Sequence, residues 1–426
     1  MQNTLAYARL QDKNDELNFL QKQFHFPQKN GEKALYLCGN SLGLQPKTAK
    51  KEFVKELDRW ADLGVEGYFK GETAWLYYHQ YLSKASASLV GAKENEVIVM
   101  NTLTTNLHLA MVSFYRPTQQ RFKIIMEGSA FPSDQYAIES QVKFHGFLPE
   151  NSIVEIFPRE GERTLRTEDI LQTIDNHKDS VALVLLGGIN YYTGQFFDLK
   201  KITQKAHEVG AIAGFDLAHV AGNIPLQLHD WDVDFAVWCT YKYLNSGPGG
   251  PSGMFVNERF ANDETLPRFA GWWGHNLEQR FQMKKGFIQM NGAAGWQLST
   301  AQVFNFVAHK ASLEIFESVG IEKLRQKSIQ LTAYLEFILN RINEKTPYFD
   351  IITPANPNER GCQLSVLTGE NGKKLFDFLA KNHVICDWRE PNVIRFSPVP
   401  LYNSFQDVYR LGQLIEKAIC ENILKN

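Results

Sequence analysis

The segment Cys239-Thr-Tyr-Lys-Tyr-Leu-Asn-Ser-Gly-Pro-Gly-Gly250 leaves an apolar run and enters a glycine-rich turn that contains a single lysine, Lys242. The apolar runs before and after it, Phe235–Cys239 and Met254–Val256, are typical of buried strands. A glycine-rich turn lets the backbone approach a ligand closely. It is a weak dinucleotide fingerprint, because its G-x-G-G-x-x-G spacing is wrong and a strand follows it rather than a helix.

Similar runs recur upstream and predict seven strands: Val97–Met100, Phe122–Met126, Ile153–Phe157, Val181–Leu186, Ala211–Phe215, Phe235–Cys239 and Met254–Val256. Helical periodicity separates most of them, in Asn106–Phe114, Asp134–Phe144, Glu168–His177 and Leu199–Val209. Thr167 is the expected N-cap of the third helix, with acidic residues after it. This alternation predicts an α/β protein built from right-handed βαβ units, with a mainly parallel seven-stranded sheet.

The pattern changes near Thr300. Two long helices, Val303–Ser318 and Ile321–Asn343, are followed by short strands with helices. A chain of 426 residues is too long for one compact core. We therefore expect a large α/β domain over residues 60–305 and a smaller α+β domain formed by residues 1–59 together with 306–426.

Composition narrows the possible partners. The 45 basic and 47 acidic residues give a net charge of −2. This balance does not indicate binding to nucleic acid or to an anionic membrane, which would require an excess of basic residues. We find neither a signal peptide nor a membrane-spanning run, so we expect a cytoplasmic protein. The five cysteines are odd in number and lack C-x-x-C spacing, which predicts reduced thiols and no metal site: Cys38, Cys239, Cys362, Cys386 and Cys420.

In an open α/β sheet, ligands bind beyond the carboxyl ends of the strands. Asp216 follows Ala211–Phe215, and Lys242 follows the next strand, so the two can converge on one site. Pyridoxal phosphate (PLP) needs such a pair: a lysine forms the Schiff base, and a carboxylate keeps the pyridine nitrogen protonated. Taken alone, however, the pair is better explained as a salt bridge or as two solvated loop residues.

Two further loops favour the cofactor. The segment Asn101–Asn106 lies between a strand and a helix, where the hydroxyls of Thr104 and Thr105 and helix N–H groups can take a phosphate. Either threonine could equally be an N-cap. In the next such loop Phe131 could stack on a flat ring, whereas Ser133 or Asp134 could cap the helix that follows.

The motifs along the chain resemble those of the kynureninase family, PLP-dependent hydrolases of the fold-type-I (aspartate-aminotransferase-like) superfamily. The resemblance covers nearly the whole chain, and the order and number of the motifs make it specific. It rests on Leu37–Pro46, Ala130–Asp134, Tyr136–Ser140, Tyr191–Gln195, Gly214–His219, Leu228–Trp231, Cys239–Asn245, Gly271–His275 and Pro398–Asn403.

The resemblance implies hydrolysis of L-kynurenine to anthranilate and L-alanine, and of 3-hydroxykynurenine to 3-hydroxyanthranilate and L-alanine, in tryptophan catabolism and NAD precursor synthesis. It implies a fold-type-I transferase-like fold and a homodimer that shares residues across its interface. Lys242 would hold PLP and move protons. Tyr241 would carry a proton, or would only bind phosphate. The implied cofactor-binding set is Leu103, Thr104, Phe131, Pro132, Ser133, Asp134, Asp216, His219, Tyr241, Lys242, Trp272 and Thr300, with Trp272 and Thr300 reached across the interface.

The implied substrate-binding residues are Arg395, Ser41 and Tyr68. Arg395 would grip the amino-acid carboxylate, a bidentate task suited to guanidinium. Three positions depart from the family pattern. Thr300 replaces a common Asn, Gly187 replaces a serine near the cofactor, and Tyr68 stands where a substrate-side His is frequent.

Three alternatives remain open. A cysteine desulfurase or small aminotransferase would share the fold, but a desulfurase needs a nucleophilic cysteine on a mobile loop, for which Cys362 and Cys386 are the late-chain candidates. A non-catalytic PLP-fold binding protein would be expected to lose the lysine or the arginine. A nicotinamide oxidoreductase would need a G-x-G-x-x-G motif after an early strand, and this sequence has none there.

Overall fold

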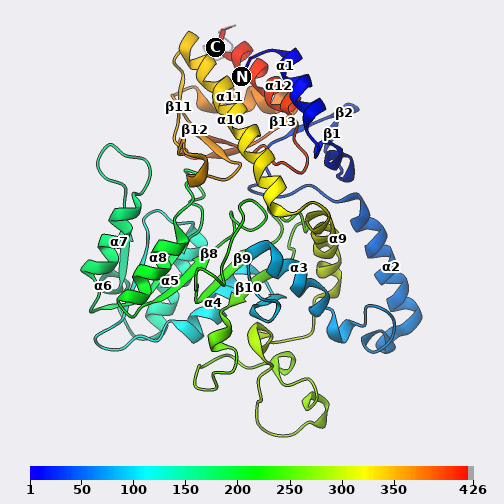
Figure 1. Ribbon diagram of the computed structural model, residues 1–426, viewed down its shortest axis with the longest axis vertical. Helices are drawn as coiled ribbons and strands as arrows, with labels where there is room; N and C mark the ends of the chain where they lie inside the picture. Colours follow the sequence, from blue (N-terminus) through cyan, green and yellow to red (C-terminus); the bar gives the residue numbers. More distant parts are fainter. Residues whose placement is uncertain (421–426) are drawn as a thin grey trace.

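A computed structural model describes residues 1–420, and its central feature is one seven-stranded sheet with the order β4-β10-β9-β8-β7-β5-β6 (Figure 1). Strand β10 is antiparallel to both neighbours, and all other pairs are parallel. The predicted sheet is therefore confirmed, with bounds that differ by up to two residues. The strands are β4 (Val97–Met100), β5 (Lys123–Glu127), β6 (Ile153–Ile156), β7 (Val181–Gly187), β8 (Ile212–Asp216), β9 (Phe235–Cys239) and β10 (Ser252–Val256).

Both faces of the sheet are buried, which explains why its strands are continuous apolar runs. Neighbouring residues point to opposite faces, so Ile124 belongs to one core and Ile125 to the other. Helices α4 (Leu103–Phe114) and α5 (Pro132–Phe144) pack in the first core, and α7 (Thr167–Asn176), α8 (Leu199–Glu208) and α9 (Val303–Val319) pack in the second. The result is a three-layer α/β architecture.

The predicted N-cap Thr167 was wrong, and the capping alternatives in the two earlier loops are not found either. Helix α4 begins at Leu103 after Thr102, α5 begins at Pro132 after Phe131, and α7 begins at Thr167 after Arg166, with no side-chain cap bond in any of them. In α5, Pro132 takes the first helical position, where its missing N–H costs nothing. Thr104 and Ser133 thus lie inside the first turns, and their hydroxyls bond each other at 2.8 Å instead of capping a helix.

A smaller antiparallel sheet has the order β11-β12-β15-β14. Its strands are β11 (Phe349–Ile351), β12 (Leu364–Thr368), β14 (Asp387–Arg389) and β15 (Val393–Phe396). Helices α10 (Ile321–Lys345), α11 (Gly372–Lys381) and α12 (Phe405–Cys420) pack with it. The N-terminal helix α1 (Leu5–Asn14) lies beside α12 (Figure 1), and β3 (Leu35–Tyr36) pairs with β13 (Val384–Ile385).

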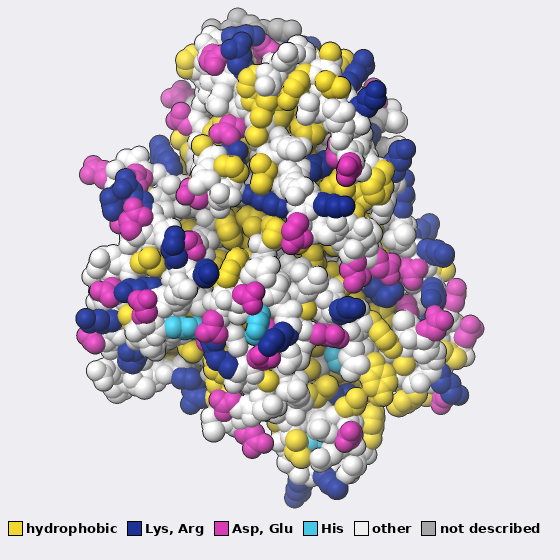
Figure 2. Space-filling model, in the orientation of Figure 1, with side chains coloured by type: hydrophobic (Ala, Val, Ile, Leu, Met, Phe, Trp, Pro, Cys, Tyr) yellow, Lys and Arg dark blue, Asp and Glu magenta, His cyan; other side chains and the backbone are white. Residues whose placement is uncertain are grey.

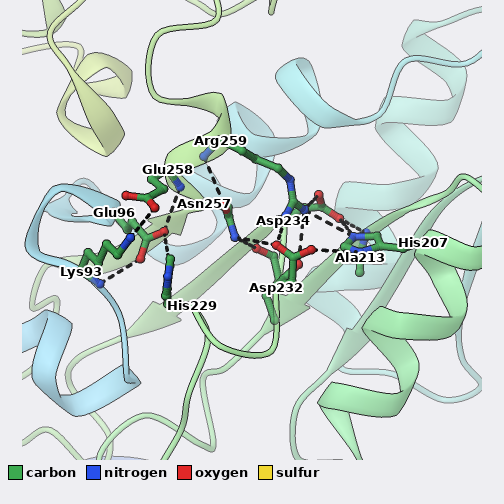
Figure 3. A network of polar contacts seen from close by, with 11 residues as sticks. Lys93, Glu96, His207, Ala213, His229, Asp232, Asp234, Asn257, Glu258 and Arg259 are labelled. Carbon is green, nitrogen blue, oxygen red and sulfur yellow. Dashed lines mark hydrogen bonds and ion pairs between the residues drawn. The ribbon is translucent and has the colours of Figure 1, made fainter.

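A charged network fixes the amino edge of the large sheet (Figure 3). Glu96, just before β4, accepts the backbone N–H groups of Lys93 and Glu258 and contacts His229 at 3.0 Å. Asp234, just before β9, accepts the Ala213 N–H at 2.7 Å and pairs with Arg259. Each buried carboxylate thus has several donors, as burial requires. These contacts hold four strand ends together opposite the carboxyl edge.

Among residues 1–420, every helix is too short or too polar to span a lipid bilayer.

The buried imidazole of His309, on α9, predicts a pH dependence of stability. Burial lowers its pKa from 6.5 to about 3. The unfolded chain therefore binds more protons between those pH values, so the free energy of unfolding falls as the pH falls through that window. His309→Leu should reduce the loss between pH 7 and pH 5 by roughly 2 kcal/mol, measured by urea denaturation. A His25→Gln control changes an exposed ring. Equal losses in wild type and His309→Leu would contradict the prediction.

Candidate active site

A cleft with about 540 Å³ of empty space, open solvent at its mouth included, lies at the carboxyl edge of the large sheet. The strands β5, β7, β8 and β9 all end at it, as expected for a doubly wound sheet. The cleft is lined by Leu103, Thr104, Glu127, Phe131, Ser133, Asp134, Gly187, Ile189, Tyr191, Asp216, Ala218, His219, Tyr241 and Lys242. Nine predicted site residues therefore share it, and Pro132 begins α5 beside it.

Lys242 follows β9 and contacts a histidine rather than an aspartate. Its Nζ lies 3.1 Å from Nε2 of His219 and 5.8 Å from the ring centroid of Phe131. Within the described residues no ion pair joins it to Asp216, although its charge opposes the burial that raises the pKa of Asp216. A simple Asp–Lys salt bridge therefore does not explain the pair. Burial, with Lys242 and two arginines nearby, lowers the pKa of His219 well below its usual value. His219 is therefore neutral, and its Nε2 can accept a hydrogen bond from Lys242.

Two carboxyl groups share a hydrogen bond deep in the cleft. Asp216 ends β8 and accepts the Ala218 N–H at 2.7 Å, while Asp134 hydrogen-bonds Asp216 from the first turn of α5. Burial, and then the charge of Asp216, raises the pKa of Asp134 well above its usual value. Asp134 is thus the protonated partner and donates to Asp216, which keeps one negative charge at the cleft floor.

A third acid, Glu127, ends β5 and was missed in the sequence. Both of its carboxylate oxygens accept the Gly187 N–H, at 3.0 and 3.2 Å, and burial raises its pKa to about 7. A Cβ at Gly187 would lie 2.8 Å from Oε1 of Glu127, so this position favours glycine here. Glu127 follows an apolar run just as Asp216 does, and that signal could have identified it.

Hydroxyl groups gather beside the helix starts at one side of the cleft. Thr104 and Ser133 bond each other, and Leu103 is the first residue of α4. The first-turn N–H groups of α4 and the Ser133 N–H of α5 could join these hydroxyls in holding a phosphate. Tyr241 borders the same cleft, and burial raises the pKa of its phenol, so it keeps its proton at neutral pH.

Arg395 and Ser41 meet at the adjoining small sheet. Arg395 is fully buried, and its Nη1 donates to the carbonyl oxygen of Tyr191 at 2.7 Å. Its Nη2 and the Ser41 hydroxyl both donate to Oδ2 of Asp387. Tyr191 connects this cluster to the cleft, because its ring stands edge-on against Phe131 with centroids 5.2 Å apart. Sequence reasoning missed Asp387 because only the pairing of β14 with β15 places it opposite Arg395.

Trp272, Thr300 and Tyr68 lie together but not in the cleft around Lys242. They line a separate apolar pocket on the surface. Trp272 is 46% exposed, and its surroundings include several exposed large apolar side chains: Val65, Phe69 and Phe281. Figure 2 shows hydrophobic side chains gathered at the lower right of the face that it draws. Single scattered apolar residues are ordinary on a surface, but a contiguous patch marks a contact site.

The described cysteines are free thiols. Burial raises the pKa of Cys362 to about 12 and that of Cys386 well above its usual value. Neither is a candidate for the exposed thiolate that a desulfurase needs. The side chain of Cys420 lies outside the described residues.

Comparisons with known proteins point to one family. A family model for the kynureninase C-terminal domain matches residues 324–415. The chain is 56% identical to the kynureninase of Flavobacterium psychrophilum, over 99% of each chain, and 54% identical to that of Flavobacterium johnsoniae, over 98% of this chain and 99% of the relative.

The solved structures that match are more distant and establish the fold alone. A cysteine desulfurase from Escherichia coli has a TM-score of 0.75 at 18% identity, covering 95% of this chain and 98% of its own. One from Thermococcus onnurineus has a TM-score of 0.72 at 18% identity, covering 91% and 94%. The predicted fold-type-I architecture is thus confirmed. With full-length identity above one half to its relatives, the chain belongs to the kynureninase family of PLP-dependent hydrolases.

Proposed function

We propose that this protein hydrolyses the Cβ–Cγ bond of L-kynurenine to give anthranilate and L-alanine, with 3-hydroxykynurenine as a second substrate. The observation that carries the proposal is the meeting of Lys242 with the Asp134–Asp216 acid pair in one buried cleft, beside Arg395. Full-length relatives described as kynureninases support it. With this activity the protein would act in tryptophan catabolism and in the supply of NAD precursors.

The residues of the cleft fit PLP. Two buried polar atoms of lining residues, Nδ1 of His219 and Oδ1 of Asp134, have no hydrogen-bond partner within the described residues, which suits a site meant to hold a polar ligand. Thr104, Ser133 and the helix N-termini would take the phosphate. Phe131 would cover one ring face, and Asp216 would pair with the ring nitrogen.

When bound, PLP supplies an electron sink that makes the bonds around the substrate Cα and Cβ labile. Lys242 would hold the cofactor and then carry the Cα proton, with neutral His219 at 3.1 Å as its hydrogen-bond partner. Arg395 would orient the substrate through its α-carboxylate, helped by Ser41. Protonated Asp134 would keep the charge on Asp216 fixed.

Tyr241, which lines the cleft, would donate a proton near the substrate carbonyl or Cβ. Its raised pKa keeps the phenol neutral, so the group has a proton to give. The same phenol could instead bind only the cofactor phosphate.

We also propose a homodimer in which Trp272, Thr300 and Tyr68 of one subunit complete the site of the other. Support comes from their grouping on an exposed apolar surface, away from the Lys242 cleft of their own chain. Tyr68 would then face the aromatic end of the substrate. A cytoplasmic location fits the reduced cysteines and the absence of an electrostatic footprint for membranes.

The division into a large domain (60–305) and a small domain (1–59 with 306–426) is likewise a proposal. One buried core contains only residues between 98 and 298, and another contains only residues 8–37 and 331–418. A third core draws on both parts and would hold one against the other. The proposed cleft opens beside that junction.

The central test uses the purified protein with PLP. It should absorb visible light, be bleached by borohydride, and release fluorescent anthranilate from L-kynurenine. Lys242→Ala should lower turnover by a factor of roughly 1,000, because both the covalent hold and the proton carrier are lost. Borohydride should then no longer fix the cofactor to the chain, as seen by mass spectrometry. A colourless wild type, or a variant with wild-type turnover, would rule the proposal out.

Tyr241→Phe separates the two roles of the phenol. If Tyr241 transfers a proton, kcat at saturating PLP should fall by roughly 100-fold while the fold and the bound cofactor remain. If it only binds phosphate, the affinity for PLP should fall and kcat at saturating PLP should match wild type. Steady-state turnover and a PLP titration measure both.

Mixed dimers test the shared site. In the proposed dimer, each site takes Lys242 from one subunit and Trp272 and Thr300 from the other. A hybrid of Lys242→Ala with the double variant Trp272→Ala/Thr300→Ala therefore has one site with both changes and one intact site. Co-expression of the two with separate tags should restore about a quarter of wild-type activity in a random mixture. No gain over the separate variants would show that the residues do not act across an interface.

A further inference from the structure

Arg395 already has a carboxylate partner in this structure. Strands β14 and β15 are antiparallel and place Asp387 directly opposite Arg395. Opposite residues of such a pair have their side chains on the same face, so an ion pair between them is favoured. Arg395 Nη2 donates to Oδ2 of Asp387, and Arg395 Nη1 is taken by the Tyr191 carbonyl at 2.7 Å.

Asp387 also has a second arginine. Arg389 lies two residues along β14, on the same face, and its Nη2 is 3.1 Å from the same Oδ2. The Ser41 hydroxyl is a third donor to that oxygen. Burial alone would raise the pKa of Asp387, but Arg395, Ser41 and Arg389 outweigh it and lower the pKa. Asp387 is therefore charged at neutral pH.

The cluster has one uncompensated positive charge, because two arginines face one aspartate. The charge of this cluster acts on the cleft. Burial and the charge of Lys242 are the two largest causes that lower the pKa of His219, and Arg395 and Arg389 are the next two. The Arg389 guanidinium lies 5.9 Å from the ring centroid of Tyr191, which packs on Phe131. One α-carboxylate entering the cleft would balance that charge.

The substrate carboxylate and Asp387 need the same donors. Bidentate binding of a carboxylate uses two parallel N–H groups of one guanidinium. In Arg395, which is 1% exposed, Asp387 holds Nη2. The side chain of Arg389 is 35% exposed and stands within hydrogen-bond distance of Asp387 already. Arg389 can therefore receive the Asp387 carboxylate after only a short movement.

We propose that Asp387 is an exchangeable counter-ion: it neutralises Arg395 in the free enzyme and passes to Arg389 when a substrate carboxylate binds. This inference rests on the proposed function, in which Arg395 binds that carboxylate. In the free enzyme the pair avoids a buried charge without a partner, which is strongly destabilising. Arg389 is a positioning residue that acts on substrate binding through Asp387.

A permanent salt bridge that only orients Arg395 predicts the opposite sign of effect. Removing an exchangeable competitor should strengthen carboxylate binding, whereas removing a fixed support should weaken it. Asp387→Asn deletes the charge and retains the shape. We therefore expect the holoenzyme of Asp387→Asn to bind L-alanine about tenfold more tightly than wild type. L-Alaninamide, which lacks the carboxylate, should bind both proteins alike.

The measurement is a titration of each holoenzyme with L-alanine or L-alaninamide, followed by visible absorption and by the shift in thermal unfolding temperature. Asp387→Asn without ligand should unfold at a lower temperature than wild type, and L-alanine should raise that temperature more than in wild type. Weaker or unchanged alanine binding in Asp387→Asn overturns the counter-ion role. An equal change for alaninamide also overturns it, because the effect would not depend on the carboxylate.

Arg389→Ala gives an independent test that decides the question even if Asp387→Asn does not fold. Without Arg389, Asp387 stays on Arg395, so alanine binding should weaken about tenfold and alaninamide binding should not change. On the Asp387→Asn background the effect of Arg389→Ala should vanish, because Arg389 acts through that carboxylate. Unchanged alanine binding in Arg389→Ala would reject the proposal.

Arg395→Ala distinguishes this inference from the proposed function. It should abolish the preference for alanine over alaninamide. If it does so while Asp387→Asn weakens alanine binding, only the counter-ion role fails. If the preference survives in Arg395→Ala, the assignment of Arg395 as the carboxylate site fails, and the counter-ion role fails with it.

Discussion

The hydrogen bond between Asp134 and Asp216 is the constraint around which the cleft is organised. Two carboxyl groups buried side by side cannot both be charged at low cost, so one keeps its proton and donates to the other. The remaining charge sits on Asp216, where β8 ends and the Ala218 N–H supports it. A fixed negative charge at the floor of the cleft is what a protonated pyridine ring requires.

The large sheet divides its two edges between stability and chemistry. At the amino edge, the carboxylates of Glu96 and Asp234 are saturated with donors and connect several strand ends (Figure 3). At the carboxyl edge, polar atoms of Asp134 and His219 have no partner within residues 1–420. A satisfied network rigidifies the sheet, and the unsatisfied atoms are left for a ligand. The rigid edge thus supports a site that is incomplete without its cofactor.

The second half of the site depends on the small sheet. Arg395 lies beside the cleft, where β15 pairs with β14 and where the carbonyl of Tyr191, from the loop after β7, accepts its Nη1. The cluster of Arg395, Arg389 and Asp387 sets a net charge that matches one carboxylate. In the proposed exchange, a substrate carboxylate is bound without movement of whole domains. Only the Asp387 carboxylate moves, from the guanidinium group of Arg395 to that of Arg389.

The sequence by itself determined the seven-stranded sheet and much of the cleft. Apolar runs buried on both faces specify strands, and polar residues directly after them, such as Asp216 and Lys242, must fall at the carboxyl edge. Three helix starts were displaced by one to three residues, because Thr, Ser and Asp can serve as caps or lie just inside the first turn. Glu127 followed the same rule as Asp216 and could have been found.

Only the tertiary structure decided which groups touch. Lys242 pairs with His219 and not with Asp216, because the turn after β9 directs its side chain toward the loop after β8. Asp387 and Arg389 could not be found in the sequence, since their role comes from the register of two short strands and from packing against Tyr191. Local pattern fixes where a side chain stands along its strand, whereas contacts between distant segments depend on how the two sheets pack.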